Sequence, residues 1–281
     1  MSTLSTDLSI APSQLLVHSL QIMTEFYRDY VGLEVLSKSD KTVLLGYGQT
    51  GIIELVAKAK LLQAPPTAAG LFHNAILFDS RQQLVRGVAR TVEASPALFQ
   101  GTGDHLVSEA FYFSDPEGNG LELYYDRPRE QWQWEDGQIV MDTKYIDPLS
   151  YLRKYSQDAS GGKARKIGHV HLRVGDISLA RAFYVDMLGF EVTASSWPGA
   201  LFVSIGGYHH HIGLNTWASR GAGKREPALG FSGATFHLQA EADVAALAQR
   251  LESKNHAFIL KNGVLETADP WGNRLIFVTN S

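Results

Sequence analysis

Residues 26–35 read FYRDYVGLEV and residues 183–192 read FYVDMLGFEV, so one ten-residue segment recurs 157 positions further along the chain. A second segment, DPEGN at residues 115–119, recurs as DPWGN at residues 269–273, which is 154 positions further along. Two matches in the same order at nearly the same spacing indicate a duplication, because a shared helix face or a shared turn would not fix both. The chain is therefore expected to contain two similar halves.

The sequence around these segments predicts one repeated order of elements. A short apolar strand at residues 15–17 precedes apolar residues at helical spacing from Leu20 to Tyr30, and three short strands follow. The same strand-helix-three-strand order starts again near residues 68, 165 and 228. We therefore predict an α+β chain with an N-terminal half, a connector and a C-terminal half, divided as follows: 1–126 with βαβββ modules at about 10–66 and 68–126, 127–164 as the connector, and 165–281 with modules at about 165–227 and 228–281.

The composition excludes several classes of function. A net charge of −4 without a long block of basic residues argues against nucleic-acid binding. The chain has no cysteine, which excludes disulfides, thiolate metal sites and a cysteine nucleophile. No apolar run is long enough for a membrane span, so we expect a soluble cytoplasmic protein, with a homo-oligomer left open. The glycine-rich segment at residues 46–51 precedes a strand rather than a helix, which favours a hairpin turn over a dinucleotide-binding loop.

The repeated modules give the chain a family resemblance. In number and order they resemble the vicinal-oxygen-chelate superfamily, which includes glyoxalases, bleomycin-resistance proteins and extradiol dioxygenases. The resemblance implies two paired, cup-shaped mixed β-sheet barrels, with a divalent metal held by residues of the first and last strands of a module pair. It leaves the reaction open, because one fold serves many chemistries.

The resemblance also selects candidate metal ligands. In the second module the matching positions hold His73 and Glu122, and in the third module they hold His169. The matching positions of the first and fourth modules hold residues that cannot serve as ligands: Pro12, Gly233 and Ile276. Two histidines and one carboxylate form the ligand set that leaves positions on iron open for substrate and oxygen. We therefore expect modules two and three to pair and to form the metal cup.

A more specific motif surrounds Glu122. The segment from Gly103 to Glu122, GDHLVSEAFYFSDPEGNGLE, resembles the signature of type I extradiol ring-cleaving dioxygenases such as catechol 2,3-dioxygenase. The resemblance implies that His105 is an acid-base group, that Tyr112 hydrogen-bonds the bound diol, and that Glu122 binds iron. In YHHHIGLNTW, which starts at Tyr208, strand alternation places His210 on one face and His211 on the other. One of these two is expected to assist oxygen, and the sequence does not choose between them.

These residues suit the cleavage of a small aromatic diol by O2. A catechol chelates one metal ion through two adjacent hydroxyls, and loss of a proton to a nearby base makes it a better electron donor. We therefore expect an Fe(II)-dependent oxidoreductase of aromatic hydrocarbon catabolism that opens the ring to a semialdehyde, with Mn(II) as the alternative ion. The rival interpretations are a glyoxalase-like metal-dependent lyase or isomerase, and a metal-free drug- or aromatic-binding protein.

Overall fold

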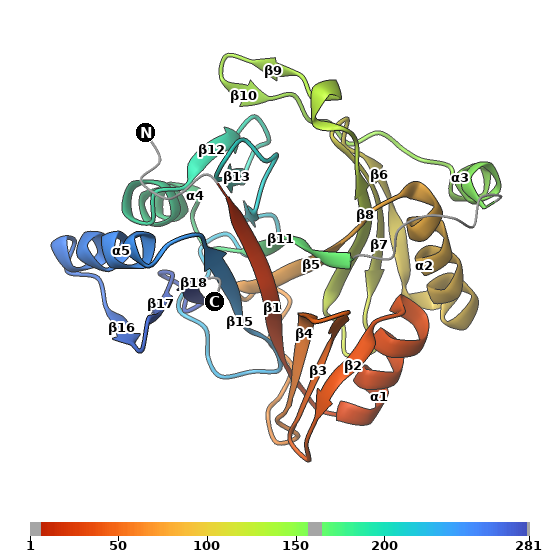
Figure 1. Cartoon of the computed structure of the whole chain (residues 1–281), viewed down its shortest axis with the longest axis horizontal. Coiled ribbons are helices and arrows are strands. Elements are labelled where there is room, and N and C mark those ends of the chain that lie inside the picture. The colour runs from red at the N-terminus through yellow and green to blue at the C-terminus, as the bar shows by residue number, and fades with distance from the viewer. Residues whose placement is uncertain (1–6, 157–164, 280–281) are drawn as a thin grey trace.

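The computed structural model describes residues 7–156 and 165–279 (Figure 1). Parts of three predicted segments lie outside the described residues: 1–6 of the N-terminal half, 157–164 of the connector and 280–281 of the fourth module. None of the described helices is both long and apolar enough to cross a membrane.

The N-terminal half contains two βαβββ units in the predicted order. The elements of the first unit are β1 (Leu8–Val17), α1 (Leu20–Glu25), a π-helical turn (Phe26–Val31), β2 (Glu34–Lys38), β3 (Thr42–Tyr47) and β4 (Thr50–Ala57). Those of the second are β5 (Gly70–Phe78), α2 (Arg81–Ala94), a 3₁₀ turn (Pro96–Leu98), β6 (Phe99–Asp104), β7 (Ser108–Ser114) and β8 (Gly120–Asp126). Strands β3 and β4 form an antiparallel hairpin, so the glycine-rich segment is a turn, as predicted.

The connector and the C-terminal half continue the pattern. The described part of the connector holds a 3₁₀ turn (Arg129–Gln131), β9 (Trp134–Glu135), β10 (Gln138–Ile139) and α3 (Pro148–Tyr155). The third unit consists of β11 (Arg165–Arg173), α4 (Ile177–Arg181), a π-helical turn (Ala182–Met187), β12 (Glu191–Ala194), β13 (Ala200–Ser204) and β14 (Ile212–Asn215). The fourth consists of β15 (Gly230–Leu238), α5 (Glu241–Ser253), β16 (Phe258–Lys261), β17 (Val264–Ala268) and β18 (Arg274–Thr279).

The first strands of the four units join them in the order β15-β1-β11-β5 (Figure 1). Strand β5 pairs antiparallel with β11 along nearly its whole length, and β1 pairs in the same way with β15. In each unit the last strand runs parallel to the first strand of the same unit. The second module is thus paired with the third, as the distribution of candidate ligands predicted, and the first is paired with the fourth.

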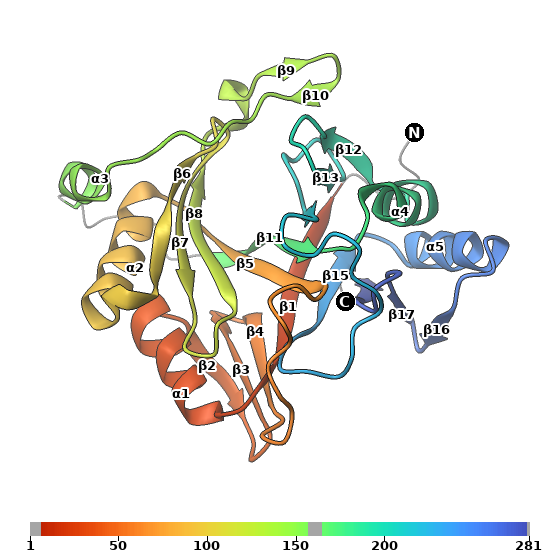
Figure 2. The same ribbon diagram turned by 180° about the vertical axis from the view of Figure 1, so that it is seen from behind.

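Strand β11 shows how alternation separates the core from the cup. Its apolar residues Val170 and Leu172 are fully buried in the hydrophobic core, together with Val174, which follows the strand. The histidines at the intervening positions point to the opposite face of the strand. The helices α1 and α2 cover one flank of the molecule and α4 and α5 the other, as the two opposite views show (Figures 1 and 2). The polar face of the central strands thus points away from the helices and toward the cups.

The two repeated sequence segments contact each other in the folded chain. The Tyr27 hydroxyl, in the first π-helical turn, donates to Asp115 Oδ2 over 3.1 Å. The corresponding Tyr184 donates to Asp269 Oδ2 over 3.0 Å. Each half therefore repeats one hydrogen bond between its first module and the turn of its second module, which explains why both segments recur at nearly one spacing.

The structure corrects one part of the ligand comparison. The register that pairs Ala75 with Glu122 in the second module pairs Gln14 with Glu54 in the first, so Glu54 occupies the carboxylate position there. The first module has therefore kept that position, contrary to the expectation that it was lost. Its carboxylate accepts a hydrogen bond of 2.8 Å from the Gln14 side chain, and the histidine position of the same module holds Pro12.

Candidate metal centre

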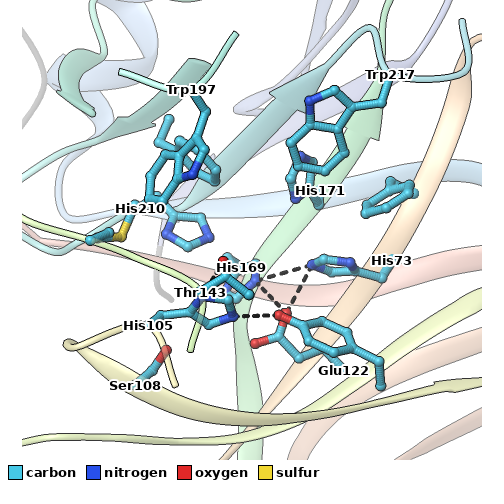
Figure 3. Close-up of a pocket in the computed structure, with 14 residues that line it drawn as sticks. His73, His105, Ser108, Glu122, Thr143, His169, His171, Trp197, His210 and Trp217 are labelled. Atoms are coloured by element: carbon cyan, nitrogen blue, oxygen red, sulfur yellow. Dashed lines mark hydrogen bonds and ion pairs between the residues drawn. The ribbon is translucent and has the colours of Figure 1, made fainter. Parts of the chain in front are cut away.

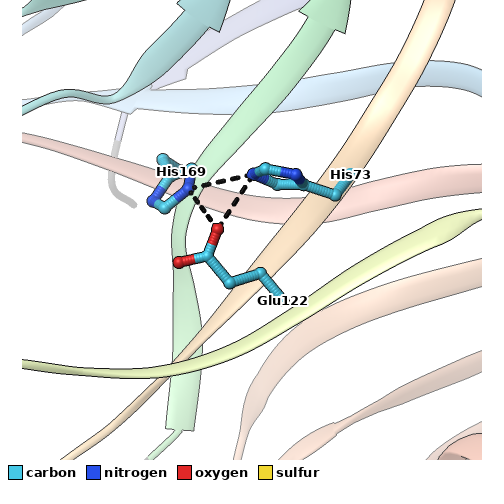
Figure 4. Close-up of side chains that lie close together, drawn as sticks. All are labelled: His73, Glu122 and His169. Carbon is cyan, nitrogen blue, oxygen red and sulfur yellow. Dashed lines mark hydrogen bonds and ion pairs between the residues drawn. The ribbon is translucent and has the colours of Figure 1, made fainter. Parts of the chain in front are cut away.

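Three side chains from three different strands meet at one point between modules two and three (Figure 4). Glu122 Oε2, on β8, lies 3.0 Å from Nε2 of His73 on β5 and 3.2 Å from Nε2 of His169 on β11. The two histidine nitrogens are 3.4 Å apart. Metal bonds of about 2.0–2.2 Å place neighbouring ligand atoms about 3 Å apart. The three donor atoms therefore fit adjacent positions around a divalent ion.

The protonation states at this point also suit a metal. Burial lowers the pKa of His169 to about 4, because an imidazolium loses its hydration inside the protein. Burial has the opposite effect on Glu122, but the neighbouring imidazoles of His169 and His73 outweigh it and hold the pKa of this carboxyl well below its ordinary value. At neutral pH the site presents a neutral imidazole and an ionised carboxylate, the forms in which these side chains bind metals.

The three donors line a cavity of about 340 Å³ that opens between the two modules (Figure 3). The cavity has two kinds of lining. Its polar residues are His73, His105, Ser108, Tyr112, Glu122, Thr143, His169, His171 and His210. Its apolar residues are Phe72, Met141, Trp197, Phe202 and Trp217. The cavity thus gathers the three candidate ligands, the expected acid-base group His105 and the expected hydrogen-bond partner of the diol, Tyr112.

His105 and Tyr112 form a hydrogen-bonded pair beside the three donors. His105 Nε2 lies 2.6 Å from the Tyr112 hydroxyl, and His105 Nδ1 lies 2.9 Å from the carbonyl oxygen of Asp142 in the connector. Because a carbonyl oxygen only accepts, we assign the proton to Nδ1, so that Nε2 accepts from Tyr112. Burial, and then the charge of Glu122, raises the pKa of Tyr112 well above its ordinary value, which keeps the phenol protonated.

Only one of the two alternative histidines from the histidine run faces this cavity. The ring of His210 lies 4.1 Å from the ring of His169, measured between centroids, and lines the cavity. His211 points away, into a separate cavity, and its Nδ1 lies 2.8 Å from Ser204 Oγ. His211 was predicted as an equal alternative to His210, and the structure corrects this. Neighbouring side chains leave the backbone on opposite sides just before β14, and only one of those sides faces the cup.

A largely buried polar network behind the candidate ligands was not predicted from the sequence. Asp126 accepts from the Tyr208 hydroxyl over 2.8 Å and lies 2.8 Å from Nε2 of His209. The hydroxyls of Tyr208 and Tyr124 are also 2.8 Å apart. One signal was present in the sequence, because Glu122, Tyr124 and Asp126 alternate along β8 and must share a face. The network connects β8 of the second module to the histidine run of the third.

Comparisons with known proteins place the chain in a family. A sequence model described as the "Glyoxalase/Bleomycin resistance protein/Dioxygenase superfamily" matches residues 166–277. The chain is 36% identical over 277 residues to "Catechol-2,3-dioxygenase" of Bacillus subtilis (strain 168), and the match covers 96% of each chain. The chain belongs to the glyoxalase/bleomycin resistance/dioxygenase superfamily. It is also 24% identical over 183 residues to "Metapyrocatechase" of Geobacillus stearothermophilus, which covers 65% of this chain and 51% of that one.

A solved structure supports the fold assigned to this superfamily member. The chain is similar to the crystal structure of glyoxalase I from Zea mays, with a TM-score of 0.60 and 14% identity. That similarity covers 97% of this chain and 92% of the maize chain. At this identity the likeness concerns the fold alone, which is the mixed α+β arrangement of the superfamily.

Proposed function

We propose that the chain is an extradiol ring-cleaving dioxygenase that adds O2 to a catechol-type diol. The observation that carries the proposal is the position of the His105–Tyr112 pair, which lines the same cavity as the donors of His73, Glu122 and His169. The catechol-2,3-dioxygenase relative of Bacillus subtilis supports the same reaction. We propose Fe(II) as the metal, with Mn(II) as the alternative, because two imidazoles and one carboxylate suit both ions.

The proposed reaction is balanced without a further reductant. The bond that breaks joins one hydroxyl-bearing ring carbon to its neighbour that carries no hydroxyl. Each of these two carbons receives one oxygen atom of O2. The ring gives up four electrons and O2 takes up four, so the product is a ring-opened hydroxy acid that carries an aldehyde. Bound Fe(II) would supply open positions at which the two diol oxygens and O2 are held together.

The chain's own residues would move and hold protons around the diol. His105 Nε2 is the proposed base once the Tyr112 hydroxyl turns its proton toward the diol, and the Nδ1 hydrogen bond to Asp142 fixes the imidazole so that Nε2 faces Tyr112. A proton taken from the diol at Nε2 would give an imidazolium with both N–H groups matched to acceptors, and His105 would return it during ring opening. The Tyr112 hydroxyl would orient the ionised diol oxygen, since it remains protonated.

His210 would act at the other side of the donors. Its ring lies against His169 and lines the cavity, so its polar edge can hydrogen-bond a small ligand such as O2. Burial lowers the pKa of His210 well below its ordinary value, which favours the neutral imidazole. The cytoplasmic location, the homo-oligomer and the absence of nucleic-acid and membrane partners stay predictions of the sequence.

The direct test is ring cleavage by the reconstituted protein. The protein is loaded with Fe(II) under nitrogen, mixed with catechol, exposed to air, and monitored for the yellow semialdehyde and for oxygen uptake. Product formed with one O2 consumed per catechol supports the proposal. A protein that binds iron but leaves every catechol intact contradicts it and favours the lyase or isomerase. A protein that binds aromatic ligands but no metal favours the binding protein.

Variants separate metal binding from proton transfer. His105→Ala is expected to retain iron and to lose about 10²–10⁴-fold in kcat, which is the usual contribution of general acid-base catalysis. Glu122→Gln is expected to lose iron and activity together. His18→Ala is the matched control, because His18 is exposed and lies outside the cavity. Full activity in His105→Ala would remove that residue from the mechanism.

A further inference from the structure

Four apolar aromatic side chains, two Phe and two Trp, line the cavity beside the metal donors. Phe202 lies on β13, Trp197 and Trp217 lie in the loops before β13 and after β14, and Phe72 lies on β5. Ring centroids are 5.5 Å apart for Phe72 and Trp217, and 5.4 Å apart for Trp197 and Phe202. In Figure 3, Trp197 and Trp217 stand on the side of His169 opposite to Glu122 and Ser108. A ligand held by its polar end at the donors would extend its remaining part along these rings.

This aromatic wall is held in place by hydrogen bonds between two loops. The indole N–H of Trp217 donates to the carbonyl oxygen of Pro198, which follows Trp197, over 3.2 Å. The backbone N–H of Thr216 donates to the carbonyl oxygen of Gly199 over 2.8 Å. These two hydrogen bonds join the loop before β13 to the loop after β14. The wall is formed before any ligand arrives, which reduces the entropy cost of binding.

The wall reaches the protein surface at one edge. Trp217 is 54% exposed and Phe72 is 37% exposed, although both are large apolar side chains. Exposed apolar groups that touch each other at a cavity mouth mark a place where apolar ligand surface is removed from water. The mouth therefore favours a ligand that is apolar on this side.

Beside this wall the cavity offers no cationic side chain to such a ligand. Among the described residues that line it there is no lysine or arginine, and its one acidic residue is Glu122, a candidate metal ligand. The hydroxyls of Ser108 and Thr143 are neutral. The cationic residues Lys166 and Arg129 line a different, smaller cavity, which they share with His211. A ligand carboxylate against the aromatic wall would lose its hydration without gaining an ionic partner, which is strongly unfavourable.

We infer that the substrate is a catechol with an uncharged apolar substituent, a short alkyl or aryl group packed against Trp197, Phe202 and Trp217. The inference rests on the proposed function for the position of the diol. It excludes catechols with a carboxylate side chain as preferred substrates. The cavity of about 340 Å³ is near the lower end of common ligand sites, about 300–1,000 Å³, so the substituent is small.

The test compares catechols that differ in the size of an apolar substituent or in the charge of a side chain. The iron-loaded protein is assayed with catechol, 4-methylcatechol and 4-ethylcatechol, and with 3,4-dihydroxyphenylacetate and its methyl ester. We expect kcat/KM to rise about fourfold for each buried methylene. We also expect the acid to be about a hundredfold poorer than its ester, because of the unpaired charge. An acid as good as the ester would overturn the inference.

Binding without turnover separates this inference from the proposed function. Under nitrogen, quenching of tryptophan fluorescence is titrated with the ester and with the acid. Ester binding at least about tenfold tighter than acid binding supports the apolar site even if no catechol is cleaved, in which case only the proposed reaction fails. Equal or tighter binding of the acid overturns the apolar site, whatever the outcome of the cleavage assay.

A charge placed in the wall should reverse the preference. Trp197→Arg puts a cation beside the expected substituent, and Phe72→Lys does the same at the mouth, where folding tolerates change more readily. Leu260→Lys on β16 is the control, since Leu260 is 49% exposed and lies outside the cavity. We expect the acid-to-ester ratio of kcat/KM to rise at least about tenfold in either wall variant and to stay unchanged in the control. An unchanged ratio in both folded wall variants would overturn the placement of the substituent.

Discussion

The duplicated turn offers a test in which one half of the molecule serves as the control for the other. Asp115 and Asp269 are both almost fully buried, and each carboxylate accepts four hydrogen bonds. Two come from backbone N–H groups of the turn, one from an asparagine side chain and one from a tyrosine hydroxyl, over 2.8–3.1 Å in both halves. Only the first turn leads into the strand that carries Glu122.

The substitutions Asp115→Asn and Asp269→Asn should therefore cost similar stability. Each leaves the two backbone hydrogen bonds at Oδ1 but replaces Oδ2 by an amide NH2, which cannot accept from the asparagine or from the tyrosine. A hydrogen bond to a charged group contributes about 1.5–3 kcal/mol, so the loss of two should lower the free energy of unfolding by about 3–6 kcal/mol. Denaturant unfolding, followed by circular dichroism, measures this difference.

Metal affinity should separate the two variants. Strand β8 begins at Gly120, directly after the first turn, and Glu122 is its third residue. A disturbed turn should weaken metal binding about 10–100-fold, as the loss of a supporting contact usually does. The second turn leads to β18, where the corresponding residue is Ile276, so Asp269→Asn should bind metal as the wild type does. A loss below about 1 kcal/mol in both variants, or an equal loss of metal affinity in both, would refute the reasoning.

Three further outcomes are expected. Burial raises the pKa of Glu109, but hydrogen bonds from Arg81 and Tyr151 outweigh it and hold this pKa below its ordinary value. The contribution of Glu109 to the free energy of unfolding is therefore complete above the pKa of 4.5 in the unfolded chain, and it is lost as the pH falls through the lower pKa of the folded chain. Glu109→Gln should then be less stable than wild type by about 2–4 kcal/mol at pH 7, and the gap should close in acid unfolding titrations. Gly168→Ala, whose new methyl group would overlap the Tyr124 hydroxyl, should lose about 3 kcal/mol in chemical denaturation; unchanged stability would contradict the close packing there. Chelation of the metal should lower the free energy of unfolding by about 2.7 kcal/mol relative to metal at a hundred times its Kd, and should have no effect in Glu122→Ala.

Much of the fold could be predicted because it depends on patterns that can be read along the chain: the alternation within a strand and the repetition of segments. The period of two along residues 168–174 separates a packed face from a histidine face, and the structure keeps both faces. The repeated segments predicted duplicated modules, and the Tyr27–Asp115 bond explains why they recur together. The candidate donors of His73, Glu122 and His169 converge because Ala75 on β5 lies opposite both His169 and Glu122, and His73 is two residues before Ala75 on the same face of β5.

The two incorrect predictions concern Glu54 and His211, where the neighbouring strands decide which residues match and which side faces the cavity. Glu54 was not predicted as the counterpart of Glu122 because the first module lacks the repeated turn that marks this position in the second and fourth modules; strand register reveals the match. His210 and His211 could not be separated by alternation alone, since alternation does not say which side is the cup. Which histidine faces the cavity depends on the strands of the second module, because they pack over only one side of this segment.

The sequence by itself predicted the four modules through periodicity and repetition, and the family resemblance carried by those modules pointed to the candidate metal donors and to the pairing of modules two and three. Only the tertiary structure decided what surrounds those donors. Trp197 and Trp217 come from separate loops, Met141 comes from the connector and Phe72 comes from the other half. No sequence period links these residues, because they meet only when the two modules pack, and it is that packing that gives the cavity its apolar, uncharged wall.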